Sequence, residues 1–230
     1  MSKETVKRIT LFDSTDLTAA EEYFSDMARS GWMLKKHGFV SEFTRCEPQK
    51  LRFSVQILYP KRGTNYEKAV KEYTELCEQA GWRSVSSYSG MHVFVTEKSD
   101  IPEIVTDPKE RIEAVSRQSR IGIILLWLVP LLFIGGTAQF IKSLSEGKSF
   151  PSLLALEFPM TLCFVSLLAA AVIKTASYLK WRNEAVRSAA SDMPIRYYDL
   201  REAGLRKTFL CICLAMIMAA GIISLIGCFV

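Results

Sequence analysis

The run from Ile121 to Ile141 constrains this chain more than any other feature, because its 21 residues include no charged side chain. A helix of that length spans roughly 30 Å, which is the thickness of the hydrocarbon core of a bilayer. Thr208–Val230 is a second charge-free run, and Leu153–Leu179 is apolar apart from Glu157 near its start and Lys174 near its end. The three runs predict three membrane-spanning helices, at about 121–141, 153–179 and 208–230.

The polar side chains inside these runs are the candidate functional residues of the membrane region. Glu157 and Lys174 lie close enough to a helix end for their charges to reach the headgroup layer. Lys174 has a second interpretation, as the buried partner of a polar group such as Gln139, and we favour the first. Cys211 and Cys213 are about 200° apart on a helix, which favours packing cysteines over a metal site.

The distribution of basic residues predicts the orientation of the chain. Four basic residues lie between 109 and 120 and seven between 180 and 207, but the 142–152 loop holds only two. Basic loops stay in the cytoplasm. We therefore expect a multi-pass protein of the inner (plasma) membrane, with its N-terminus in the cytoplasm and its C-terminus outside. Residues 1–16 lack an apolar core, so we expect the first span to act as the insertion signal.

The charge composition divides the chain into parts of different character. Residues 1–100 carry 15 basic and 14 acidic side chains, whereas residues 121–179 carry 3 and 2. We therefore expect a cytoplasmic domain over 1–100, a helical connector over 101–120 and a membrane region over 121–230. The net charge of +5 is not concentrated on the cytoplasmic domain, so nucleic acid is not an expected partner.

The cytoplasmic domain alternates strand and helix signals. Apolar residues recur at helical spacing from Leu17 up to Gly31, and again from Tyr66 up to Gly81, while 51–59 alternates with the period of two that is typical of a strand. The predicted elements are a strand over 6–12, a helix from 17, a strand over 33–45 with a bend at Gly38, a strand over 51–59, a helix from 64, and a strand or hairpin over 84–97.

A duplication supports this order of elements. At an offset of 50 residues, Gly31-Trp32 matches Gly81-Trp82, and Glu22-Tyr23 matches a second Glu-Tyr pair. Two β-α-β halves in series predict an α+β fold, namely a ferredoxin-like β-α-β-β-α-β sandwich with one antiparallel sheet and two helices on one face. Gly after a helix adopts the left-handed conformation, and the following Trp folds back as an apolar cap. We therefore interpret Gly31, Gly81, Trp32 and Trp82 as structural anchors rather than ligand-stacking residues.

The connector carries a helix-start signal. Asp107 suits an N-cap, Pro108 the first helical position and Glu110 the third. One helix from Pro108 into the first span is one interpretation, and a short frayed linker is the other. Thr64 and Glu67 have the spacing of a capping box for the second helix of the domain.

No catalytic motif is present in the sequence. It contains no phosphate-binding loop, no Gly-x-Ser-x-Gly elbow and no zinc-binding His-Glu-x-x-His helix. His37 and His92 could bind a metal with Cys46, but we favour exposed positions on a strand face. We therefore expect no enzyme activity and no cofactor.

Two segments of the membrane region suggest contacts. Ala215, Ala219, Ala220, Ser224 and Cys228 follow a small-residue spacing, which predicts that the third span packs against another span, within the chain or in a homo-oligomer. The basic 180–207 segment contains Trp181, Tyr197 and Tyr198. It either lies on anionic headgroups or serves only to keep this loop inside.

Several residues of the domain carry a family resemblance. They are Phe12-Asp13, the stretch from Glu22 to Leu34 with Met-Ala-x-x-Gly-Trp at 27–32, Phe43 and Arg52-Phe53. Over roughly 5–100 the chain resembles the bacterial family called domain of unknown function 2812. It departs from that family at Tyr23-Phe24, where Trp-Leu is common. The resemblance implies a small domain followed by membrane spans, no established activity, and genes near PadR-type regulators, hence a regulatory role.

These observations predict a non-enzymatic integral membrane protein. Its cytoplasmic domain would bind a protein partner or a small ligand, and the lipid bilayer would hold the rest, in a regulatory or envelope-sensing role. The alternative is an accessory subunit of a membrane transporter, in which Gln139, Glu157 and Lys174 would matter.

Overall fold

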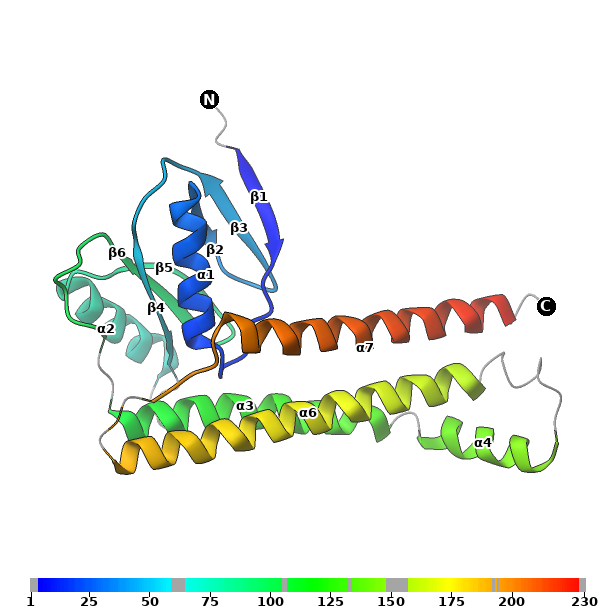
Figure 1. The fold of residues 1–230 in the computed structure, drawn as a ribbon. Helices are drawn as coiled ribbons and strands as arrows, with labels where there is room; N and C mark the ends of the chain where they lie inside the picture. The colour runs from blue at the N-terminus through cyan, green and yellow to red at the C-terminus, as the bar shows by residue number, and fades with distance from the viewer. Residues whose placement is uncertain are drawn as a thin grey trace. The chain divides into compact units, whose positions relative to one another are not determined.

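A computed structural model describes residues 4–58, 65–104, 107–131, 134–147, 157–191, 193 and 195–227. The chain divides into two compact units (Figure 1). The first unit contains Met1–Ser119 and Trp181–Ala203, and the second contains Arg120–Lys180 and Gly204–Val230. Three long helices begin in one unit and continue into the other.

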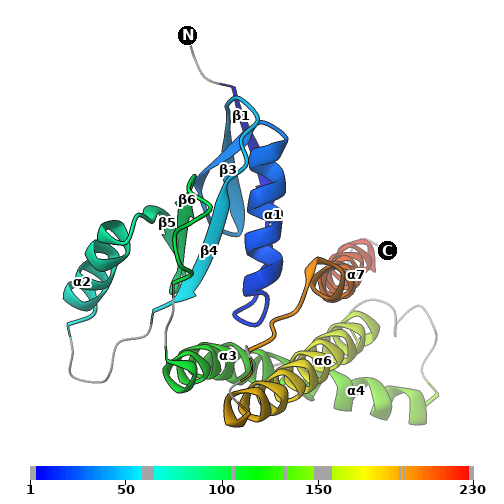
Figure 2. The ribbon, with the colours of Figure 1, turned by 60° about the vertical axis from the view of Figure 1, so that its left-hand side comes forward.

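The first unit is built from two copies of a β-α-β-β motif (Figures 1 and 2). The first copy comprises β1 (Thr5–Ile9), α1 (Leu17–Arg29), β2 (Trp32–Lys36) and β3 (Val40–Arg45). The second comprises β4 (Arg52–Ile57), α2 (Tyr66–Gln79), β5 (Arg83–Tyr88) and β6 (Met91–Thr96). Each copy forms a three-stranded antiparallel sheet, in the orders β1-β3-β2 and β4-β6-β5.

The α+β class is confirmed, but the prediction of a single ferredoxin-like sheet with β-α-β-β-α-β order is wrong. The predicted strand over 33–45 is a hairpin, in which β2 and β3 pair with Leu34 opposite Phe43. The predicted strand or hairpin over 84–97 is also a hairpin. Ser89 and Gly90 both have positive φ, 49° and 79°, as a tight two-residue turn requires. Each half therefore contributes three strands, and these pair with one another to form a separate sheet.

An aromatic core connects the two copies. Phe24 of α1 is fully buried, and its ring lies 6.3 Å from that of Phe43 on β3 and 5.9 Å from that of Phe53 on β4. α1 thus packs against both sheets. A second, smaller cluster beneath α2 contains Cys77, Trp82 and Phe94.

The remaining described helices are the long helices α3 (Pro108–Leu131), α6 (Glu157–Ala190) and α7 (Leu200–Gly227), and the shorter α4 (Ile134–Ser145). The backbone N–H of Lys109 donates to Asp107 Oδ1 at 2.8 Å, so Asp107 is the N-cap of α3. The helix then runs without a break to Leu131, which excludes the frayed linker. At α2 the N-cap is Asn65, whose side chain accepts from Lys68 N–H, rather than Thr64, which lies outside the described residues.

Two of these helices, Pro108–Leu131 and Thr161–Ala190, are long and apolar enough to cross a membrane. Within the second unit they lie side by side (Figure 2), and Trp127 Nε1 donates to Thr175 Oγ1 at 3.0 Å. The predicted first span, 121–141, is divided between α3 and α4, and residues 132–133 lie outside the described part. The third predicted span falls on α7, but 228–230 and several of its side chains are not described, so it stays a prediction.

Candidate functional site

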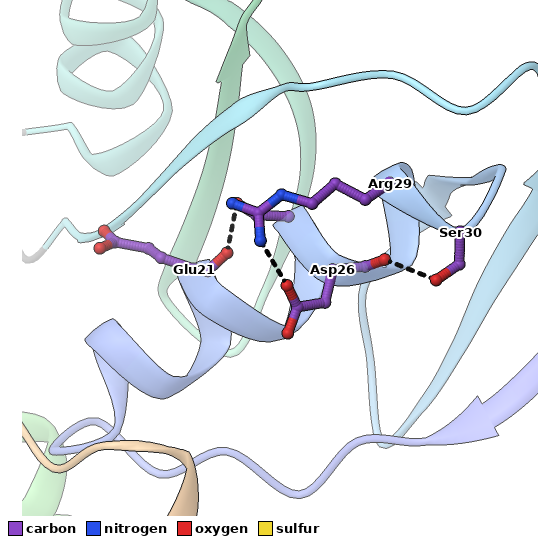
Figure 3. A network of polar contacts seen from close by, with 5 residues as sticks. Glu21, Asp26, Arg29 and Ser30 are labelled. Atoms are coloured by element: carbon purple, nitrogen blue, oxygen red, sulfur yellow. Dashed lines mark hydrogen bonds and ion pairs between the residues drawn. The ribbon is translucent and has the colours of Figure 1, made fainter.

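The helix α1 has two polar regions of different character. On its outer face, Arg29 pairs with Asp26 at 2.8 Å, and Ser30 Oγ donates to the carbonyl of Asp26 (Figure 3). Figure 3 shows the carboxylate of Glu21 pointing away from this pair. Its Oε1 accepts a hydrogen bond from the backbone N–H of Val55 on β4 at 2.8 Å. Glu21 therefore holds the first copy of the motif against the second.

Burial changes the acidity of Glu21. Desolvation raises the pKa of its carboxyl from 4.5 to about 7, and the nearby charges of Glu103 and Glu22 act in the same direction. The Val55 hydrogen bond and the Arg111 guanidinium lower the pKa, but less than burial raises it. A carboxyl that titrates near neutral pH, beside a specific charged partner, is the kind of group that functional sites contain.

Arg111 links Glu21 to the segment 195–199. Its guanidinium lies 4.9 Å from the centre of the Tyr197 ring, a cation–π distance, and its Nε is buried without a hydrogen-bond partner among the described residues. Tyr197 also contacts Trp181 of α6, with ring centres 5.8 Å apart. Burial raises the pKa of Tyr197 to about 12, so its hydroxyl stays protonated. We call Glu21, Arg111, Tyr197 and Trp181 the Glu21 cluster.

The loop before α1 makes a second set of contacts to the same elements. The hydroxyls of Ser14 and Ser119 lie 2.6 Å apart, which joins this loop to α3. The carbonyl of Thr15 accepts from the backbone N–H of Tyr198 at 3.1 Å. Because Ser14 and Thr15 are buried, these hydrogen bonds are shielded from water. The domain is thus fastened to α3 and to 195–199 at two places.

Both sequence-predicted glycines have the left-handed backbone, with φ of 81° at Gly31 and 92° at Gly81. Trp82 is 3 % exposed and donates its indole N–H to the carbonyl of Pro102. Trp32 is only half-buried and lies beneath the guanidinium of Arg45 at 4.9 Å. The two Gly-Trp pairs therefore share a backbone conformation, but only the second Trp belongs to a buried cluster.

The favoured interpretation of the histidines, exposed positions on a strand face, is wrong. His37 and His92 are 2 % and 5 % exposed. The ring of His37 lies against those of Phe24 and Tyr88, with ring centres 5.4 and 5.9 Å apart. His37 Nδ1 lies 3.2 Å from Ser41 Oγ, and burial lowers the pKa of His37 to about 4. In the part of the chain that is described, no three His, Cys, Asp or Glu residues are grouped as metal ligands would be, and Cys46 is free.

The membrane-region candidates lie on two helices, α4 and α6. Gln139 is exposed on α4, and the side chain of Glu157 lies outside the described part. Lys174 is half-buried on α6, with its Nζ beside Gly122 of α3. Trp181, Tyr197 and Tyr198 are buried within the first unit, so their rings do not face a headgroup layer. The contact of the basic 180–207 segment with anionic headgroups stays a prediction.

Sequence reasoning missed Glu21. The pair Glu21-Glu22 suggests acidic residues in the first turn of a helix, but α1 begins at Leu17 and has no acidic residue there. The available signal is the spacing: Glu21 lies four residues after Leu17 and three before Phe24, on the apolar face of the helix. A carboxyl group on that face is buried when the helix packs, and it must then be paired with a partner or protonated.

Comparison with known proteins identifies the family. Residues 16–127 match the family described as "Protein of unknown function (DUF2812)". This region is a DUF2812 domain. No curated protein and no solved structure matches the chain. The match begins one residue before α1 and reaches Trp127, so the DUF2812 region contains Glu21, Arg111 and both Gly-Trp pairs, but not Tyr197 or Trp181.

Proposed function

We infer that the chain is a non-enzymatic integral membrane protein that couples the state of its DUF2812 region to its membrane helices. The observation that carries this inference is the unbroken helix α3. Ser119 joins it to the loop before α1, and Arg111 contacts Tyr197 and acts on the charge of Glu21. The helix then continues to Leu131 through an apolar sequence. A rigid helix of 24 residues, about 36 Å long, transmits a tilt or rotation that a flexible linker would absorb.

The Glu21 cluster supports a regulatory role rather than a purely structural one. A change in the charge of Glu21, or in the position of Arg111, alters the electrostatic environment of Tyr197 and therefore the docking of 195–199. A protein partner or small ligand on the domain would act through the same contacts. The basic residues flanking the apolar helices support a cytoplasmic domain, an inner-membrane location and a C-terminus outside.

The proposal is tested in the organism's own membranes with the full chain. A reporter that is active only in the cytoplasm is expected to work when fused within 191–196 and to fail when fused at Gly147. The tagged chain is also solubilised in mild detergent, beside an Arg111→Ala variant as the matched control. Wild-type protein is expected to retain a bound protein or metabolite that the variant holds less well. Reporter activity at both positions, or no retained molecule, would contradict the proposal.

A further inference from the structure

Within the second unit, the side chain of Lys174 reaches from α6 to α3. Its Nζ lies against Gly122, so close that a Cβ added to this glycine would stand 3.3 Å from it. Gly122 is the second residue of the charge-free run that begins at Ile121. The ammonium group of a residue in the apolar helix α6 is therefore held beside the start of the predicted first span.

A second cation belongs to the same pair of helices. Arg120 Nε of α3 donates to the hydroxyl of Tyr178 of α6 at 3.4 Å. Tyr178 is buried and lies four residues after Lys174, on the same face of α6. The Arg120 guanidinium and the Lys174 ammonium are therefore both held at the contact between α3 and α6. We call Arg120, Gly122, Lys174 and Tyr178 the α3–α6 site.

Acidic residues that would neutralise these two cations are distant along both helices. α3 contains no acid after Glu113, and α6 contains none between Glu157 and Glu184. At 1.5 Å per residue, roughly 10 Å or more of helix axis separates each of these acids from the cation on its own helix. The second unit as a whole contains seven basic residues and two acidic ones. The α3–α6 site therefore suits an anion from outside the chain.

The residues next to the two cations are apolar and exposed. Ile121 follows Arg120 and is 46 % exposed, and Ile173 precedes Lys174 and is 37 % exposed. A free anion such as inorganic phosphate gains nothing from an apolar surface, whereas an anion that carries acyl chains buries them against it. Basic positions between apolar helices on the cytoplasmic side bind lipid headgroups in membrane proteins. Charge and surroundings together favour an anionic lipid.

We propose that the α3–α6 site binds the phosphate of an anionic phospholipid at the headgroup level of the bilayer. This inference rests on the proposed membrane function. The guanidinium of Arg120 has further N–H groups besides the Nε–H that Tyr178 accepts, and these suit two phosphate oxygens. The ammonium of Lys174 adds a charge-assisted hydrogen bond, and Gly122 leaves the space in which it lies. Because the phosphate contacts both helices, it fastens α3 to α6.

The test identifies the lipids bound to the full chain in mild detergent by native mass spectrometry. The delipidated protein is mixed with equal amounts of phosphatidylglycerol, which is anionic, and phosphatidylcholine, which has a phosphate but no net charge, both with the same acyl chains. Lys174→Gln and Arg120→Gln each remove one charge, and Gly122→Leu fills the space beside Nζ without changing the charge. The matched control is Lys180→Gln, at an exposed lysine six residues further along α6.

Wild-type protein and Lys180→Gln are expected to prefer phosphatidylglycerol several-fold, and each variant of the α3–α6 site should lose most of this preference. An equal preference in all the proteins would overturn the proposal, as would a loss in Lys180→Gln as large as that in Lys174→Gln. Displacement of phosphatidylglycerol by millimolar inorganic phosphate would show that the site takes a free anion, and would overturn the lipid assignment. A chain that does not sediment with the membranes of lysed cells would instead refute the proposed membrane function.

Discussion

Replacing Glu21 by Gln provides the sharpest test of the Glu21 cluster. The amide keeps an oxygen that can accept from Val55 N–H, and it mimics the protonated carboxyl without its charge. Because the folded-state pKa lies near 7 and the unfolded value at 4.5, the folded chain holds this proton more tightly than the unfolded chain. The stabilisation from Glu21 is therefore complete below pH 4.5 and is lost as the pH rises from 4.5 to 7.

The size of this effect follows from the two pKa values. At 1.36 kcal/mol per unit, the shift from 4.5 to about 7 corresponds to about 3 kcal/mol. Glu21 retains partial access to solvent, which screens the effect, so we expect roughly 2 kcal/mol in the free energy of unfolding. Glu21→Gln should be more stable than wild type by that amount at pH 7.5, and the difference should shrink to near zero at pH 4.5.

The assay must report on the domain within the intact membrane protein. Cys77 is buried and free, so its labelling by a maleimide in increasing urea, read by peptide mass spectrometry, gives the free energy of unfolding in micelles. Glu47→Gln, at an exposed position between β3 and β4, is the matched control and should not change the pH dependence. A pH profile of Glu21→Gln that parallels wild type would refute the assignment of a raised pKa to Glu21.

Three further predictions use the same assay. His37→Gln should remove a stabilisation that is present above pH 6.5 and is lost as the pH falls toward 4, because burial lowers the pKa of His37 in the folded state to about 4; an unchanged profile below pH 6 would contradict this. Gly81→Ala should lower the free energy of unfolding of the domain by more than about 1 kcal/mol, because φ is 92° and a Cβ would overlap the side chain of Ile101. The control Gly147→Ala, with open space around it, should leave the stability of the domain unchanged. Equal effects of the two substitutions would show that the overlap at Gly81 is relieved. Trp82→Ala should cost about 3–5 kcal/mol and Trp32→Ala clearly less, because only Trp82 is fully buried; a reversed order would contradict the placement of the two rings.

Features that depend on neighbouring residues could be predicted from the sequence. The helix that starts at Asp107-Pro108, the positive φ after α1 and α2, and the two Gly-Trp pairs all follow from local backbone chemistry. The internal duplication and the family resemblance also came from residues in order along the chain. The apolar part of the helix Pro108–Leu131 could be predicted because the hydropathy of a segment is a sum over adjacent side chains.

Features that depend on distant segments were decided only by the tertiary structure. The stretch 33–45 folds back because β3 has two partners, β1 and β2, which no local periodicity reveals. Glu21 is buried because α1 packs against β4, a strand of the other copy, and its carboxyl then finds the Val55 amide. The Glu21 cluster also joins residues that are far apart in sequence, namely Arg111 of α3, Trp181 of α6 and Tyr197 of segment 195–199. They meet because these three segments converge on one side of the domain. Local sequence sets which backbone shapes are allowed, but burial of a charge depends on which surfaces meet.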